Sequence, residues 1–140
     1  MWKGSMNKSL YQANEVKKLQ TREWVPTRLQ IRQYAEASGD FNPIHLDDRY
    51  AQEVGLGGVI AHGMLTMAQC AAMITDWVGD KGIIIELSVR FEGMVRPDEC
   101  IRFNAFVRKH QGDEMECEVV AFKDTEERVL SGFVVIKLLP

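Results

Sequence analysis

The feature that most constrains the fold of this chain is an apolar segment, residues 64–78, that precedes runs of alternating polar and apolar residues. As a helix this segment would be roughly 22 Å long, at 1.5 Å per residue. It is too short and too polar to span a bilayer. Small side chains share one of its faces and would let the helix backbone lie close to a sheet: Ala68, Ala71, Ala72 and Thr75. The segment therefore predicts a buried central helix.

Beyond Gly82 the apolar residues recur at every second position, which is the period of a strand with one buried face. Three more runs follow, at 101–107, 115–121 and 129–138, with turn residues between them. A helix followed by an antiparallel meander predicts an α+β fold in which the sheet curls around the long helix. In the first run, the residues expected to face the core are Ile85, Leu87, Val89 and Phe91.

Two shorter helices are predicted before the central one. Thr27 followed by Gln30 fits a capping box, and the helix that they begin ends near Gly39. Asp47 can cap a second short helix, which Gly55 closes.

The length of 140 residues predicts one domain over residues 1–140, with a core that needs no disulfide or metal. Residues 1–5 resemble an expression scar. Neither a signal peptide nor a membrane span is recognisable, which favours the cytoplasm. Lysine and arginine total 17 against 20 aspartate and glutamate residues, and this net charge of -3 argues against nucleic-acid binding. Wide spacing and apolar neighbours are typical of reduced core cysteines, which predicts that role for Cys70, Cys100 and Cys117.

An acid and an imidazole lie in one constrained loop, at Asp40 and His45. Gly39 can turn where a side chain could not, while Pro43 fixes its own φ and pushes Asn42 toward extended geometry. A carboxyl group and an imidazole, with ordinary pKa values of about 3.9 and about 6.5, can divide proton donation and acceptance near neutral pH. Spacing alone leaves alternatives open: a cap for Asp40, a core histidine for His45, and a bond to its own turn for Asn42.

The string from Tyr34 to Ala51 resembles the hydratase 2 motif of MaoC-like dehydratases, through Ser38-Gly39-Asp40-x-Asn42-Pro43-Ile44-His45. A second match resembles the start of that family's central helix: Val59-Ile60-Ala61-His62-Gly63-Met64-Leu65. The chain also resembles a later strand and turn of that family, at Arg90-Phe91 and Arg96-Pro97-Asp98. It differs from the family at Met94, where proline is frequent, and at Asp98, where glycine is usual. The resemblance covers about residues 27–138.

This resemblance implies a hot-dog fold, normally a homodimer, that interconverts trans-2-enoyl and (R)-3-hydroxyacyl thioesters of coenzyme A or acyl carrier protein. It implies that Asp40 and His45 are the catalytic acid/base pair and that the Gly63 backbone N–H is the oxyanion donor. The first N–H groups of a helix lack intrahelical acceptors and lie at the positive end of its dipole, which suits that donor. No metal or organic cofactor is required, because the thioester itself accepts the electrons.

Further site residues are expected around this pair. Substrate-binding positions are predicted at Asn42, which shapes the loop, and at His62 and Met64. A structural hydrogen bond that fixes the helix start is the alternative for His62. The basic residues that could meet carrier phosphates are Arg90, Arg96, Arg102, Arg108 and Lys109.

Two other functions stay open. A hot-dog acyl thioesterase would polarise a thioester with the same helix N-terminus but attack the carbonyl carbon, and the string 39–45 argues against it. A non-catalytic acyl-thioester-binding subunit would need neither Asp40 nor His45, and both are present. The sequence defines neither the acyl chain length nor the carrier, direction or pathway.

Overall fold

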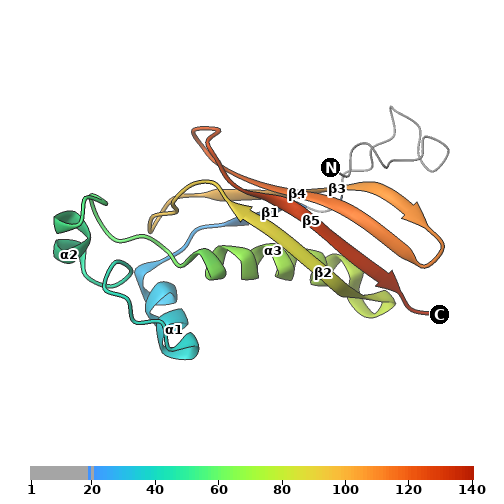
Figure 1. The fold of residues 1–140 in the computed structure, drawn as a ribbon, viewed down its shortest axis with the longest axis horizontal. Coiled ribbons are helices and arrows are strands. Elements are labelled where there is room, and N and C mark those ends of the chain that lie inside the picture. The colour runs from blue at the N-terminus through green and yellow to red at the C-terminus, as the bar shows by residue number, and fades with distance from the viewer. Residues whose placement is uncertain (1–18, 20) are drawn as a thin grey trace.

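The computed structural model describes residue 19 and residues 21–140. Its elements, in chain order, are β1 (Arg22–Trp24), α1 (Arg28–Ser38), α2 (Asp48–Glu53), α3 (Gly63–Val78), the 3-10 helix η2 (Gly79–Lys81), β2 (Gly82–Phe91), β3 (Ile101–Gln111), β4 (Glu114–Lys123) and β5 (Arg128–Leu138). The strands form one antiparallel sheet with the order β1-β3-β4-β5-β2 (Figure 1). The predicted α+β arrangement is therefore confirmed. The short strand β1 was not predicted, because three residues carry too little periodicity.

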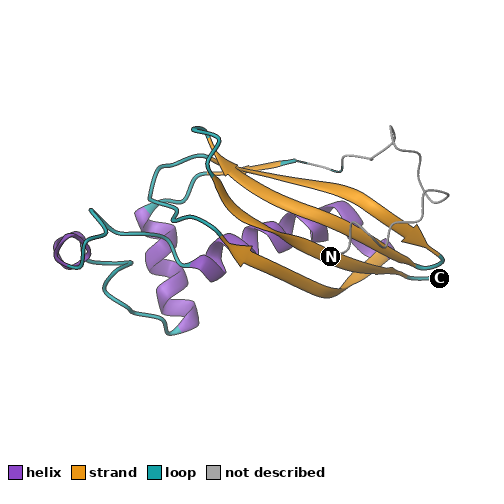
Figure 2. Cartoon of the chain, turned by 45° about the horizontal axis from the view of Figure 1, so that its top comes forward, coloured by secondary structure: helices purple, strands orange, loops and turns teal. Residues whose placement is uncertain are grey.

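Helix α3 lies along one face of the sheet (Figure 2). The side chains that it buries are all larger than that of alanine, and most are apolar: Leu65, Thr66, Cys70, Met73, Ile74 and Val78. The face of small residues is instead exposed or half-buried, so the prediction that this face packs against the sheet is wrong. Long apolar side chains bury more area against the strands than alanine does, and this burial decides which face of the helix turns inward.

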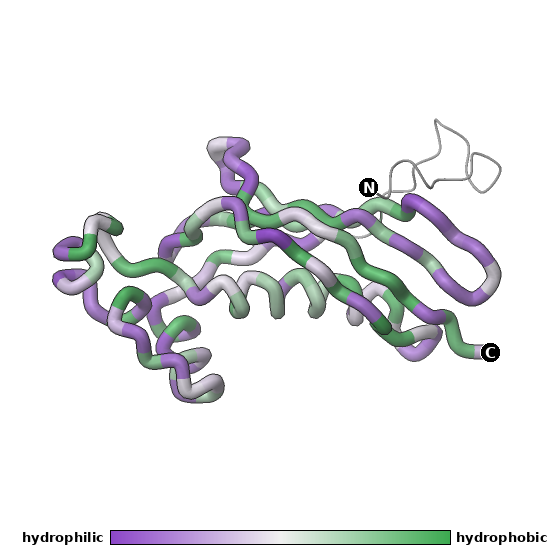
Figure 3. Tube along the Cα trace, in the orientation of Figure 1, coloured by the Kyte–Doolittle hydropathy of each residue, from purple (hydrophilic) through white to green (hydrophobic). Residues whose placement is uncertain are grey.

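The hydrophobic core fills the space between α3 and the sheet. Phe103 and Leu130 are fully buried there, and hydrophobic residues run along β5 while hydrophilic ones gather at the β3–β4 turn (Figure 3). In β2 a register shift between Ile84 and Glu86 changes which residues face the core, as a β-bulge does. Leu87 and Val89 pack against the core as predicted, but Ile85 and Phe91 are each 48% exposed, so that part of the prediction is wrong.

Helices α1 and α2 lie beyond one end of the sheet (Figure 1). Thr27 caps α1 by accepting from the Gln30 N–H at 3.0 Å, and the helix ends at Gly39, both as predicted. The backbone of Gly39 is in the left-handed region, at φ 78°. The Gln30 side chain accepts from the Trp24 indole N–H at 2.7 Å. Asp47 caps α2 as predicted.

In the described part of the chain, no helix is both long enough and apolar enough to cross a bilayer. The proposed expression scar, residues 1–5, lies outside the described residues.

Candidate active site

The loop between α1 and α2 carries Asp40 and His45, and its own polar side chains define its shape. The Asn42 N–H donates to Asp40 Oδ1, and the Ile44 N–H donates to Asn42 Oδ1, both at 3.2 Å. The Asp40 N–H donates to Ser38 Oγ, also at 3.2 Å. Asn42 therefore bonds its own turn, and its side chain is exposed.

Asp40 and His45 face one another across a short gap. His45 Nδ1 lies 2.7 Å from the Ile60 carbonyl oxygen, which can only accept, so that Nδ1 carries hydrogen. In the neutral ring, Nε2 then holds the lone pair, and it lies 4.0 Å from Asp40 Oδ2. This distance is too long for a direct hydrogen bond but suits one bridging water, since two groups about 2.8 Å from one oxygen lie roughly 4 to 5 Å apart. The imidazole is 8% exposed and the carboxylate 52%, so the pair can be reached from solvent.

Helix α3 begins at Gly63, so the Gly63 N–H is among the first N–H groups that find no acceptor within the helix. The helix dipole adds partial positive charge at this end. Met64, in the same first turn, is 55% exposed. A mostly apolar cavity of about 190 Å³ adjoins this start, and it is lined by Ile60, Ala61, Gly63, Thr66, Phe91, Gly93, Met94, Val95 and Val129.

His62 connects the start of α3 to the Asp40 loop. Its Nε2 lies 3.1 Å from the Asp40 carbonyl oxygen, and its ring stacks on that of His45 with centroids 3.7 Å apart and an interplanar angle of 25°. The His62 side chain makes no capping hydrogen bond to the described helix, so the bond that it forms ties two segments together and does not cap α3. Burial, the largest cause, lowers the pKa of His62 from its usual 6.5, and the neighbouring His45 lowers it further, while the Asp40 carbonyl acts in the opposite direction.

Asp40, His45 and His62 also form a cluster whose possible metal-ligating atoms lie within 4.8 Å of one another. The two imidazole rings are stacked, however, and a metal must lie near the plane of each ring that ligates it. Lone pairs of stacked rings lie side by side and do not converge on one point. This geometry disfavours a metal ion shared by the two imidazoles.

The glycine-rich connection before α3 is held by two side chains that the sequence did not single out for this role. The Arg96 guanidinium donates to the Leu56 carbonyl and, at 3.1 Å, to the Gly58 carbonyl. Asp48 Oδ1 accepts from the Val59 N–H at 3.0 Å. Arg96 therefore binds backbone carbonyls and holds this connection, while its role as a carrier-phosphate contact stays a prediction. Two other basic candidates are also engaged: Arg102 with Glu23 and Asp124, and Arg108 with Glu118.

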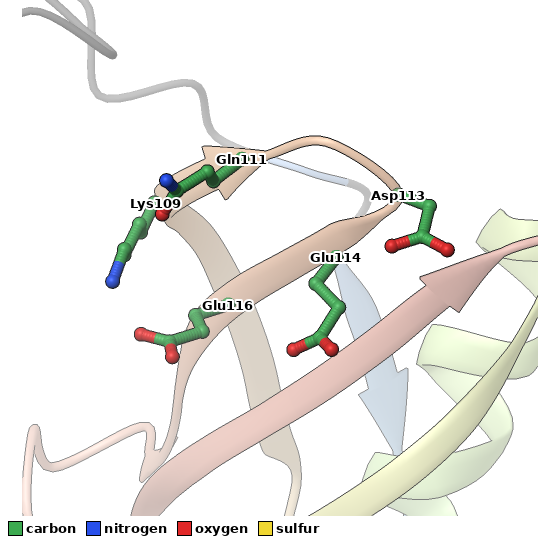
Figure 4. Close-up of a pocket in the computed structure, with 5 residues that line it drawn as sticks. All are labelled: Lys109, Gln111, Asp113, Glu114 and Glu116. Atoms are coloured by element: carbon green, nitrogen blue, oxygen red, sulfur yellow. The ribbon is translucent and has the colours of Figure 1, made fainter.

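A second cavity, of about 260 Å³, lies at the β3–β4 hairpin, and Figure 4 shows its lining. Its lining consists of Lys109, Gln111 and the three carboxylates Asp113, Glu114 and Glu116. This hairpin is at the opposite end of the sheet from α1 and α2 (Figure 1). An acidic, remote cavity is unsuited to an acyl chain.

Solved structures with the same fold include two hydratases. The R-hydratase PhaJ1 from Pseudomonas aeruginosa superposes with a TM-score of 0.83 at 25% identity, over 88% of this chain and 80% of that chain. The (R)-hydratase from A. caviae involved in PHA biosynthesis superposes with a TM-score of 0.83 at 22% identity, over 92% of this chain and 100% of that chain. These similarities confirm the predicted hot-dog fold.

Relatives by sequence include the fatty acid synthase beta subunit TOXC of Cochliobolus carbonum, 43% identical over 72 residues, which are 47% of this chain and 3% of that protein. The chain spans between 3% and 5% of the length of the fungal synthase subunits that it matches. The 3-hydroxybutyryl-CoA dehydratase of Methylorubrum extorquens is 27% identical over 107 residues, which are 75% of this chain and 68% of that protein. The model of the MaoC-like domain family matches residues 11–128, most of the chain, and the chain therefore belongs to this family.

Proposed function

We propose that this protein is a hydro-lyase that adds water to trans-2-enoyl thioesters, or removes it from (R)-3-hydroxyacyl thioesters, with Asp40 and His45 as its acid/base pair. The observation that supports this most is the separation of 4.0 Å between Asp40 Oδ2 and His45 Nε2, which suits one shared water. Membership of the MaoC-like family and the dehydratase names of relatives from Methylorubrum extorquens and Arabidopsis thaliana support the same reaction type.

In the proposed reaction, the Asp40 carboxylate holds one hydrogen of the bridging water and His45 Nε2 accepts the other. The water oxygen forms a bond to Cβ, and the electrons of the double bond move through Cα onto the thioester oxygen. The proton held by His45 is then returned to Cα, so that one water has been added across the double bond. General acid/base assistance of this kind is worth about 10²- to 10⁴-fold in rate.

The negative charge that develops on the thioester oxygen needs a donor, and we assign this role to the Gly63 N–H. Loss of such a donor typically costs about 10²- to 10³-fold in rate. The cavity beside Gly63 offers a mostly apolar surface next to this donor. A carrier of either kind, coenzyme A or acyl carrier protein, is compatible with this arrangement.

We further propose that the protein is a homodimer or a higher homo-oligomer. Within the described residues β2 is an edge strand, and Ile83 and Ile85 on it are 50% and 48% exposed. Exposed apolar residues beside an unpaired edge favour association with a second sheet. Sedimentation measurements would test this, and a monomer at micromolar concentration would contradict it.

The experiment that tests the reaction mixes the purified protein with crotonyl-CoA. Hydration removes the enoyl absorbance without releasing free thiol, and the product is expected to be the (R)-3-hydroxy thioester. Release of free thiol would assign the thioesterase reaction instead. A thermal shift with the thioester but no turnover would indicate a non-catalytic acyl-binding subunit. Enoyl thioesters of graded length on both carriers then define the substrate.

A further inference from the structure

We propose that His62 is a positioning residue that holds Asp40, His45 and Gly63 in the places that the proposed reaction needs. His62 bonds the backbone of Asp40, stacks on the ring of His45 and immediately precedes Gly63 in the chain. This inference rests on the proposed function, because positioning matters only if those three groups act on substrate.

The loop that carries Asp40 and His45 is attached to the start of α3. Three hydrogen bonds join residues 40–45 to residues 60–62: Ile60 N–H to the Ile44 carbonyl at 3.1 Å, His45 Nδ1 to the Ile60 carbonyl at 2.7 Å, and His62 Nε2 to the Asp40 carbonyl at 3.1 Å. The first two hold the His45 end of the loop. The His62 bond holds the Asp40 end, where the other bonds described above are local to the exposed turn. Without it, the carboxylate is free to move relative to the imidazole.

The rings of His62 and His45 form a stacked pair. His62 is 2% exposed, and the ring of Tyr34, from α1, also packs on it, with centroids 4.8 Å apart. A ring held on α1 and on the backbone of Asp40 gives the His45 ring a fixed surface to lie on. Aromatic pairs of this kind add stabilisation beyond that of the apolar area that they bury. The imidazole of His45 is therefore held on its face by His62 and on its edge by the Ile60 carbonyl.

The surroundings of His62 also favour its neutral form. The groups that face its ring are the phenol of Tyr34, the carboxyl of Asp40 and the imidazole of His45. Its Nε2 carries the hydrogen that the Asp40 carbonyl accepts, and its Nδ1 is buried with no hydrogen-bond partner among the described residues. A proton on a buried nitrogen that has no acceptor nearby is not stabilised by a hydrogen bond, and the charge that it brings is costly to bury. His62 thus stays neutral and leaves the proton of the reaction to His45.

Two variants separate the two contacts. His62→Gln keeps a donor near the position of Nε2 but loses the ring, and His62→Phe keeps a ring but loses the donor. Each is expected to lower kcat about 10-fold, and His62→Ala, which loses both, about 100-fold, since displacement by about 1 Å can cost about 10²-fold in rate. KM is expected to stay within about 3-fold of the wild type, because His62 does not touch the substrate. The matched controls are His110→Gln and His110→Phe, on the exposed end of β3, which should leave kcat unchanged.

Wild-type kcat in both the Gln and the Phe variants would overturn the proposal. So would a rise in KM of about 10-fold or more with unchanged kcat, because this pattern belongs to a residue that binds substrate. Melting curves identify any variant that does not fold; if His62→Ala is among them, the Gln and Phe variants decide the question.

A spectroscopic measurement separates this inference from the proposed function. Imidazole ¹⁵N spectra of the wild type should show His62 neutral, with hydrogen on Nε2, down to a pH below 6.5. Amide exchange at Asn42 should speed up in His62→Phe, because the Asp40 end of the loop is released. If the protein hydrates no enoyl thioester but both results hold, the proposed function fails while the positioning by His62 stands. A protonated His62 at neutral pH, or unchanged exchange, would refute the positioning itself.

Discussion

Replacing the Asp40 carboxylate with an amide, in Asp40→Asn, removes its charge and leaves its local contacts in place. An asparagine Oδ1 can still accept from the Asn42 N–H, which lies 3.2 Å from Asp40 Oδ1, so that the turn persists. The side chain is 52% exposed, and surface substitutions usually change the free energy of unfolding by less than about 0.5 kcal/mol. With Oδ1 still bound to the Asn42 N–H, the uncharged amide nitrogen would take the place of Oδ2 opposite His45 Nε2. That nitrogen donates and does not accept, so it cannot hold a hydrogen of the attacking water, and kcat should fall about 10²- to 10⁴-fold. At about 1.36 kcal/mol for each factor of ten, the barrier rises by roughly 2.7 to 5.4 kcal/mol.

The assay follows the loss of enoyl absorbance with crotonyl-CoA, and urea unfolding checks the fold of each variant. The matched control is Asp47→Asn, an exposed residue a few positions along the same segment. Asn caps a helix as well as Asp does, so this variant should keep both stability and turnover. A folded Asp40→Asn protein that retains more than about a tenth of the wild-type kcat would refute the role of the carboxylate. Equal losses of kcat in Asp40→Asn and Asp47→Asn would show that the assay responds to the helix cap and not to the Asp40 carboxylate.

Gly132→Ala should lower the free energy of unfolding, measured by urea titration, by about 3 kcal/mol or more. The reason is that the added methyl group would overlap the backbone carbonyl of Ser88 on β2, the strand paired with β5. An unfolding free energy equal to that of the wild type would show that β2 and β5 separate easily. Burial raises the pKa of Cys70 and of Cys117 to about 12, so that neither thiol should react with a disulfide reagent at pH 8 until the protein is unfolded. Mass spectrometry of the labelled native protein checks this. The pKa of His62 is lowered in the folded state, so the unfolded chain binds its proton first and stability should fall as the pH drops below 6.5. His62→Phe should weaken that dependence, as measured by unfolding at pH 7.5 and 5.5.

The sequence predicted the elements whose signals are local. The caps at Thr27 and Asp47 and the end of α1 near Gly39 are formed by neighbouring residues, and each is confirmed. Four alternating runs predicted the four long strands for the same reason. Membership of the MaoC-like family, suggested by the string around Asp40 and His45, is confirmed by the family model.

What the sequence missed depends on contacts between distant segments. The bulge beside Ile85 is a matter of register between β2 and β5, and the first run of alternating residues contains no sign of it. Which face of α3 turns inward follows from packing against strands that lie far along the chain. His62 illustrates both sides: its place before Gly63 marked it as a site residue, but its stacking on His45 required the loop and the helix to be brought together. The catalytic roles of Asp40, His45 and Gly63 remain predictions, and Asp40→Asn tests the first of them.

Because β2 pairs with β5, the sheet cannot form completely until β5 has been synthesised. The loop, α3 and β2 all leave the ribosome before β5, the strand that β2 pairs with, so β2 must wait for residues 128–138. Until then the incomplete sheet covers only part of the apolar side of α3. Strand pairing between segments that are distant in the sequence is also slow. A nascent chain stalled before residue 128 should therefore bind hydrophobic probes and chaperones that the finished protein does not.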